Sequence, residues 1–119
     1  MRWGVSLSGS SKLIGTGGFS ELDSQNQSGE IGCDLVKAYW GKGIMTEALK
    51  AVVKFGFESM KLHRIETWIM VENSASIHMI EKLGFQKEGF LRERQYWMGK
   101  YNDVEMFGLL RRDWESMNS

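Results

Sequence analysis

The sequence is poor in cysteine, in long apolar runs and in net charge. Cys33 is the only cysteine, which excludes an internal disulfide and favours a reducing, cytoplasmic compartment. No window holds the roughly 18 apolar residues that a transmembrane helix needs, and residues 1–5 lack the apolar block of a secretory leader. Fifteen Lys and Arg residues balance fifteen Asp and Glu residues, so the positive excess of nucleic-acid-binding proteins is missing. We therefore expect neither a membrane nor a nucleic acid as a partner.

What is present is the composition of an ordinary globular domain. Apolar residues make up 42% of the chain and charged residues 25%, which argues against disorder, and the length suits one domain over residues 1–119. His63 and His78 have no metal-ligand spacing to other residues, so no metal is expected. Cys33 is interpreted as a small buried strand residue rather than a nucleophile. Four tryptophans are expected to pack in the core or against the sheet, namely Trp3, Trp68, Trp97 and Trp114.

Apolar periodicity predicts a mixed α+β fold with the element order β-β-β-α-β-α-β-β. Strands are expected over residues 3–8, 12–20, 29–36, 64–70, 85–96 and 101–110, and helices over residues 44–60 and 74–83. The polar stretch 21–28 is expected to be an exposed loop. Ser74 or Ser76 can cap the second helix, and Gly84 stands where a left-handed C-cap residue belongs. This order predicts a mostly antiparallel sheet with helices packed on it.

A glycine-containing segment, residues 39–46, separates the third predicted strand from the first predicted helix. Gly41 and Gly43 let the backbone turn tightly and expose consecutive N–H groups, which join the unpaired donors of the helix N-terminus. Such a concave set of donors binds anions, a diphosphate among them, and Lys42 adds a positive charge. A plain glycine turn before a helix explains the same two residues equally well.

A dinucleotide site of the Rossmann type is the nearest alternative for this segment. That site needs Gly-x-Gly-x-x-Gly/Ala, whereas Thr46 occupies the third position here. It also needs an acidic residue at the end of the next strand, whereas Glu66 lies inside that strand. The three antiparallel strands predicted upstream fit it badly too, so this alternative is disfavoured.

Two segments about thirty residues apart carry a resemblance to a known family. Residues 73–76, 81–85 and 88–89 (Asn-Ser-Ala-Ser, Glu-Lys-Leu-Gly-Phe and Glu-Gly) resemble the second signature of the GNAT superfamily of N-acetyltransferases. The glycine loop resembles the first signature, Gln/Arg-x-x-Gly-x-Gly/Ala, with its fixed positions at Trp40, Gly43 and Met45. The resemblance covers nearly the whole chain and implies the GNAT fold.

Three shorter patterns are similar to the RimJ/RimL branch of that superfamily. They are Tyr-Trp-Gly-Lys-Gly in the glycine loop, Asn-x-x-Ser at residues 73–76, and a late Gly-x-Tyr-x-Asp at Gly99, Tyr101 and Asp103. Members of this branch acetylate the N-terminal amine of ribosomal proteins or small amines. The resemblance therefore implies an N-acetyltransferase whose acceptor is a primary amine, on a protein N-terminus or a small molecule.

The resemblance also implies acetyl-CoA as cosubstrate and assigns residues to it. The pyrophosphate is expected on the N–H groups of residues 41–46, and the pantetheine arm along the strand 29–36, with one N–H facing the thioester oxygen. The expected cofactor-binding residues are Leu35, Val36, Trp40, Gly41, Lys42, Gly43, Ile44, Met45, Thr46, Asn73 and Ser76. Asn73 is expected to bond the pantetheine amides, and an ordinary loop turn is its alternative role.

Two residues are the expected catalytic groups. Glu30 occupies the position of a superfamily glutamate, where a half-buried carboxylate can take a proton through water. A solvated glutamate at the end of a strand is its alternative, and Glu93 is the second candidate base. Ser76 is expected to point its hydroxyl at the cofactor sulfur, with helix capping as its alternative role.

The chain departs from the family pattern at three positions and at its front. Trp40 replaces Gln or Arg, Met45 replaces Gly or Ala, and Ile80 replaces a tyrosine that protonates the leaving thiolate in many members. The strand and two helices that usually open the fold, and that wall the acceptor site, are not seen.

Since these opening elements are not seen, the resemblance implies a fragment, an alternative start, or a protein whose sheet is completed by a partner. The strand 3–8 is then near an open edge, which suggests a homodimer. A catalytically silent CoA-binding module is the competing function. The sequence does not name the acceptor amine.

Overall fold

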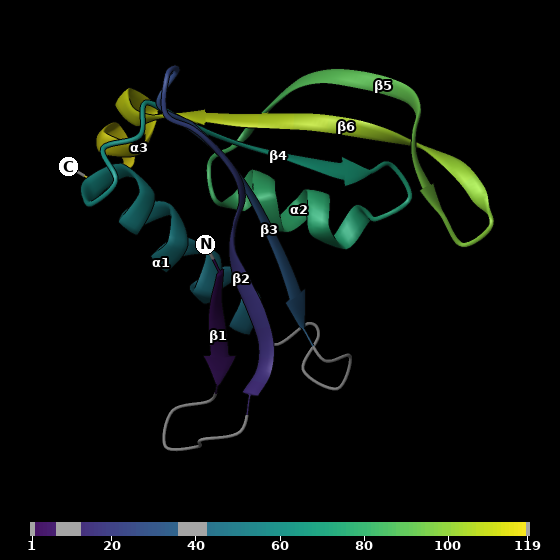
Figure 1. Ribbon diagram of the computed structural model, residues 1–119, viewed down its shortest axis with the longest axis horizontal. Coiled ribbons are helices and arrows are strands. Elements are labelled where there is room, and N and C mark those ends of the chain that lie inside the picture. The colour runs from purple at the N-terminus through teal and green to yellow at the C-terminus, as the bar shows by residue number, and fades with distance from the viewer. Residues whose placement is uncertain (1, 7–12, 36–42, 119) are drawn as a thin grey trace. The chain divides into compact units, whose positions relative to one another are not determined.

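The computed structural model describes residues 2–6, 13–35 and 43–118, with side chains described at Gly4 and over residues 18–32 and 43–118. The chain divides into two compact units, residues 1–65 and 66–119, called unit 1 and unit 2. The predicted element order is confirmed, and the fold is a mixed α+β one (Figure 1). Within the described ranges, no helix has the length and apolar character needed to cross a membrane.

Unit 1 contains an antiparallel meander and a helix. Its elements are β1 (Arg2–Ser6), β2 (Leu13–Asp23), β3 (Ser28–Leu35) and α1 (Ile44–Glu58), and β4 (Arg64–Met70) begins at its end. β1 pairs with β2 and β2 with β3, both antiparallel, as predicted, so β1 is an edge strand of this meander. The bounds predicted for β4 are confirmed to the residue.

The β2–β3 connection is shorter than the exposed loop predicted over residues 21–28. β2 continues to Asp23, and only residues 24–27 form the turn. The Asp23 carboxylate accepts hydrogen bonds from the backbone N–H groups of Gln25 and Asn26 at 3.1 and 3.0 Å, and from the Asn26 side chain at 2.8 Å. These bonds, those from Asn26 foremost, lower the pKa of the Asp23 carboxyl group. Because the Asp23 carboxylate accepts the N–H groups of the turn, β2 and β3 can remain paired as far as Asp23 and Ser28.

The core of unit 1 forms where α1 faces Phe19 of β2. The three- and four-residue spacing predicts one apolar face, of which the helix buries Met45, Leu49, Val52, Val53 and Phe57, while Ala48 is half-buried. Phe19 is 1% exposed, and a Cβ atom at Gly29 or at Gly56 would lie 2.8 or 2.7 Å from a carbon of its ring. A glycine inside a helix costs about 1 kcal/mol relative to alanine, so Gly56 is explained by this close approach.

Unit 2 contains the rest of β4, α2 (Ser74–Lys82), β5 (Gln86–Trp97), β6 (Lys100–Leu110) and α3 (Arg111–Met117). Its strands lie in the order β4-β6-β5. Buried side chains come from β4, α2, β6 and the connection between α2 and β5, among them Thr67, Ile69, Ile80, Leu83, Phe85, Val104, Phe107 and Leu109. Gly84 follows α2 with a φ of 99°, which confirms the predicted left-handed C-cap residue.

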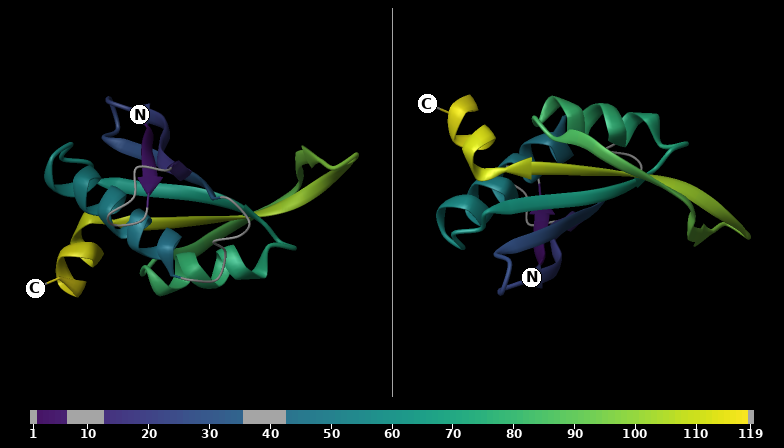
Figure 2. Two further views of the ribbon diagram at one scale, coloured as in Figure 1. Left: turned by 90° about the horizontal axis from the view of Figure 1, so that it is seen from below. Right: turned by 90° about the horizontal axis from the view of Figure 1, so that it is seen from above.

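The β5–β6 hairpin is a long twisted ribbon whose turn extends past α2 (Figures 1 and 2). Every described side chain of β5 is exposed, and Gly89 alone is half-buried, because β5 is the edge of the order β4-β6-β5. Of the two expectations for Trp97, packing in the core or against the sheet, the first is wrong for this reason, since Trp97 is 52% exposed beside the turn. Trp68 and Trp114 are half-buried, and the side chain of Trp3 lies outside the described residues.

Helix α3 was not expected from the sequence. It has seven residues, too few for an apolar period to show, and within it Arg111 and Glu115 form an ion pair of 4.0 Å one helical turn apart.

Candidate active site

The start of α1 is the described part of the predicted pyrophosphate loop. Val36 and residues 40–42 lie outside the described residues. Gly43 is the N-cap residue of α1, with a φ of 74° that residues bearing a Cβ rarely adopt, and within the described part of the chain no side chain forms a cap hydrogen bond to the helix. Glu47 donates its N–H to the Gly43 carbonyl oxygen at 3.2 Å as the first bond of the helix. The N–H groups of residues 44–46 precede this bond and therefore lie in the turn whose donors a helix leaves without intrahelical partners.

The side chains of this first turn point to different surroundings. Met45 is only 7% exposed, so its side chain packs in the core instead of standing in solvent at the start of the helix. Ile44 and Thr46 are half-buried. The replacement of Gly or Ala by methionine thus adds its bulk to the core of unit 1.

Glu30 lies on β3 beside a bulge in the β2–β3 pairing. Phe19 pairs with Ile31 and Glu21 with Glu30, which leaves Ser20 as the extra residue. The Ser20 hydroxyl donates a hydrogen bond to the Glu30 carbonyl oxygen at 3.3 Å, and the Glu30 side chain is half-buried, as predicted. Two carboxylates thus stand on opposite strands at one register position, which favours a cation near them.

Leu35, the last residue of β3, pairs with Gly15 of β2. Its side chain lies outside the described residues.

The start of α2 holds the other predicted site residues, but the cap is a different residue from those predicted. Asn73 is the N-cap, and its Oδ1 accepts a hydrogen bond from the Ser76 N–H at 3.2 Å. The prediction that Ser74 or Ser76 caps the helix is therefore wrong, because the amide oxygen one residue earlier already takes this donor. Ser76 is half-buried with its hydroxyl not used as the cap. Among the described residues, the Asn73 Nδ2 has no hydrogen-bond partner.

Strand β5 has a bulge of three residues where Glu93 lies. Leu91 pairs with Val104 and Gln95 with Asn102, so residues 92–94 stand opposite Asp103 alone. Glu93 has a φ of 49°, and its N–H donates a hydrogen bond of 2.7 Å to the Asp103 carboxylate. The late Gly-x-Tyr-x-Asp pattern contains this aspartate, but nothing in the sequence indicated its bond to Glu93.

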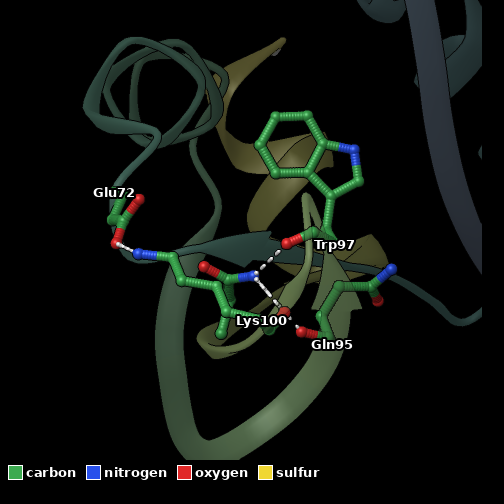
Figure 3. Close-up of polar contacts among 5 residues, drawn as sticks. Glu72, Gln95, Trp97 and Lys100 are labelled. Atoms are coloured by element: carbon green, nitrogen blue, oxygen red, sulfur yellow. Dashed lines mark hydrogen bonds and ion pairs between the residues drawn. The ribbon is translucent and has the colours of Figure 1, made fainter.

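The hairpin turn beyond the bulge is held by Asn102, which sequence reasoning missed. The side chain is 5% exposed, and its Nδ2 donates to the carbonyl oxygens of Gln95, Trp97 and Lys100 at 3.4, 3.2 and 3.1 Å (Figure 3). Lys100 also forms an ion pair of 3.1 Å with Glu72, on the turn that leads to α2 (Figure 3). An asparagine inside the predicted strand 101–110 was the available signal, because asparagine is uncommon in strands.

The predicted site residues thus fall into two groups. Unit 1 carries Glu30, Leu35 and the start of α1, whereas unit 2 carries Asn73 and Ser76 at one helix start. Comparison with known proteins decides the family. Residues 1–86 match the family model described as an acetyltransferase (GNAT) domain. The chain belongs to the GNAT acetyltransferase family.

Two relatives and one solved structure illustrate the match. The chain is 41% identical over 113 residues to the uncharacterized N-acetyltransferase p20 of Bacillus licheniformis, covering 95% of this chain and 64% of p20. It is 30% identical over 96 residues to the ribosomal-protein-serine acetyltransferase of Escherichia coli K12, covering 81% of this chain and 54% of that protein. Crystal structures of mutant forms of the spermidine/spermine N-acetyltransferase SpeG from Vibrio cholerae match with a TM-score of 0.92 and 26% identity, over 99% of this chain and 70% of theirs. The chain spans less than two thirds of the two curated relatives.

Proposed function

We propose that this protein is an acetyl-CoA-dependent N-acetyltransferase that moves an acetyl group to a primary amine. The observation that carries the proposal is the start of α1. In a chain of the GNAT family, this helix begins at a left-handed Gly43, and among the described residues no side chain forms a cap hydrogen bond to its first turn. A helix start of this kind is suited to an anion such as the pyrophosphate of CoA.

Residues 1–119 are proposed to act as one acetyltransferase domain that binds acetyl-CoA. The pyrophosphate accepts hydrogen bonds from the N–H groups of residues 41–46, beside Trp40 and Lys42. The pantetheine arm runs along β3 and bonds the backbone at Leu35 and Val36. The Asn73 Nδ2 donates to a pantetheine amide, a role compatible with capping because the cap uses Oδ1.

The chemistry is direct attack on the thioester. The acceptor arrives as an ammonium ion and gives one proton, through water, to the Glu30 carboxylate. Its nitrogen then bonds to the carbonyl carbon, and a backbone N–H of β3 stabilises the negative oxygen. The carbon–sulfur bond breaks as the amide forms, and the second proton of the nitrogen ends on the sulfur. The Ser76 hydroxyl donates a hydrogen bond to this sulfur as it leaves, in place of the tyrosine that Ile80 replaces.

The acceptor class is proposed from two relatives of different stated substrates. One is named a ribosomal-protein-serine acetyltransferase and the other a spermidine/spermine N-acetyltransferase. We place this chain in the RimJ/RimL-like branch, with either a protein N-terminus or a small amine as acceptor. β1, an edge strand of unit 1, is the proposed contact of a homodimer.

Thiol release tests the activity. The purified protein is mixed with acetyl-CoA and one acceptor in each reaction. The acceptors are spermidine, an alkyl monoamine and a peptide with a free N-terminal serine. Thiol release above the rate without acceptor supports the enzyme. CoA binding by calorimetry without turnover on any amine supports the silent CoA-binding module instead, and absence of CoA binding contradicts both functions.

A further inference from the structure

Asp103 of β6 connects two segments of unit 2 that carry proposed site residues. Its carboxylate accepts the N–H of Glu93 on β5 at 2.7 Å, and its carbonyl oxygen accepts the N–H of Val71 at 3.1 Å. Val71 lies two residues before Asn73, the cap of α2. One residue therefore fixes both the bulge of β5 and the turn that leads to the Asn73–Ser76 pair.

The bulge of β5 has a conformation that needs such a bond. Residues 92–94 occupy the place of one residue in the pairing, and Glu93 adopts a φ of 49°. An L-residue with a long side chain is unfavourable in this left-handed region, and such conformations persist where the surrounding structure holds them. They gather at functional sites, because a regular strand would point the side chain elsewhere.

A second contact anchors the other side of the bulge. The Arg94 guanidinium carbon lies 4.1 Å from the ring centroid of Trp68 on β4, within the range of a cation–π contact. The Trp68 Nε1 is buried and has no hydrogen-bond partner among the described residues, so the ring is held by packing. Glu93 is thus tied to β6 through its own N–H and its neighbour Arg94 is tied to β4, while the Glu93 side chain is exposed.

We propose that Asp103 is a positioning residue for the acceptor: it holds Glu93 so that the Glu93 carboxylate binds the ammonium group of the incoming amine. The inference rests on the proposed acetyltransferase function. An exposed carboxylate on a rigid backbone binds an ammonium ion by a charge-assisted hydrogen bond, and fixing it beforehand removes the entropic cost of ordering it. Glu30 remains the proposed general base, whereas Glu93 contributes only to binding of the acceptor amine.

The test is a double-mutant cycle at the two positions. Asp103→Leu keeps the approximate size but removes the acceptor for the Glu93 N–H, whereas Asp103→Asn keeps an acceptor oxygen and is the matched control. Glu93→Gln removes the charge that binds the ammonium group. All kinetics are measured well below the melting temperature of every variant, so that each protein is fully folded.

We expect each single substitution to weaken recognition of the acceptor amine, and the two losses not to add in the double variant. Asp103→Leu and Glu93→Gln each lower kcat/KM for the amine by about tenfold, and the double variant falls no more than about twofold below Glu93→Gln, because the two act through one contact. KM for acetyl-CoA stays within about twofold, and Asp103→Asn stays within about threefold of the parent for the amine. Additive losses, or a Glu93→Gln variant equal to the parent, overturn the proposal.

A second measurement does not depend on turnover. Hydrogen exchange of the Glu93 amide should be faster in Asp103→Leu than in the parent and close to the parent in Asp103→Asn; equal exchange in all three overturns the positioning role. A parent protein that acetylates no amine at all overturns the proposed function, and this inference with it. A parent that turns over and shows additive losses overturns the inference alone.

Discussion

The β2–β3 hairpin of unit 1 and the β5–β6 hairpin of unit 2 each place a glutamate at a bulge, but they hold it by different means. In unit 1 the bulge at Ser20 lies next to Phe19 and Ile31, which are 1% and 3% exposed, and one exposed hydroxyl bonds across it. In unit 2 the bulge lies on an exposed strand. Its backbone is fixed by the Asp103 carboxylate and, further along, by the buried Asn102 amide.

The difference follows from what each strand can bury. Apolar packing orders β2 and β3 through Phe19, so the region around Glu30 needs few polar bonds. No side chain of β5 is buried, and its irregular backbone is therefore held by side chains of β6. Glu30 and Glu93 should accordingly respond to different substitutions.

The largest effect is expected at Glu30. Glu30→Gln keeps the shape but removes the proton acceptor, and loss of a general base costs about 10²–10⁴-fold in rate. The rate of the variant should recover as pH rises toward the pKa of the acceptor amine, while the parent levels off earlier. Steady-state rates from pH 6 to 10 measure this. Identical pH profiles and turnover in both proteins would make Glu30 a bystander and direct the search to Glu93.

The next largest difference between the two hairpins is expected in how much a polar substitution lowers the free energy of unfolding. Asn102→Ala leaves the turn carbonyl groups without their buried donor and should lower the free energy of unfolding by about 1–3 kcal/mol. Ser20→Ala removes one exposed hydrogen bond and should change it by no more than about 0.5 kcal/mol. Urea unfolding followed by circular dichroism measures both. Equal losses of unfolding free energy in the two variants would contradict the view that packing stabilises the β2 bulge and hydrogen bonds stabilise the β5–β6 hairpin.

Cofactor binding should depend on the start of α1 in unit 1. Gly43→Asp puts a carboxylate among the proposed pyrophosphate donors and should raise the Kd for CoA at least tenfold, about 1.4 kcal/mol. Gly43→Asn is the matched control, since Asn and Asp both tolerate a left-handed backbone and only Asp is charged. Calorimetry with CoA compares them. Unchanged binding by Gly43→Asp would rule out the glycine loop as the pyrophosphate site.

The smallest effect is expected at Ser76 in unit 2. Ser76→Ala should lower kcat severalfold, since a lost hydrogen bond to the leaving sulfur costs about 1 kcal/mol, and leave CoA binding within a few-fold. Because Asn73 caps α2, the melting temperature should not change. Ser74→Ala, at the first residue of the same helix, is the control and should keep the parent kcat. A loss of stability without a loss of kcat would leave Ser76 a structural role only.

Much of the fold could be predicted because its signals are local. The alternation in β4, the three- and four-residue spacing in α1 and the glycine after α2 each depend on residues within one or two turns of backbone. The two signature segments likewise indicated the GNAT family before any strand was paired, and the match over residues 1–86 confirms it.

Tertiary structure decided the rest. Asp103 and Glu93 are ten residues apart, and their bond exists only because the strand register leaves residues 92–94 opposite one partner. The exposure of Trp97 depends on β5 lying at an edge of unit 2, since an identical sequence in a central strand would bury it. The choice of Asn73 over Ser74 as cap depends on which backbone leaves the helical conformation first. Local patterns determined which segments become strands and helices, whereas pairing between distant segments determined which side chains face one another.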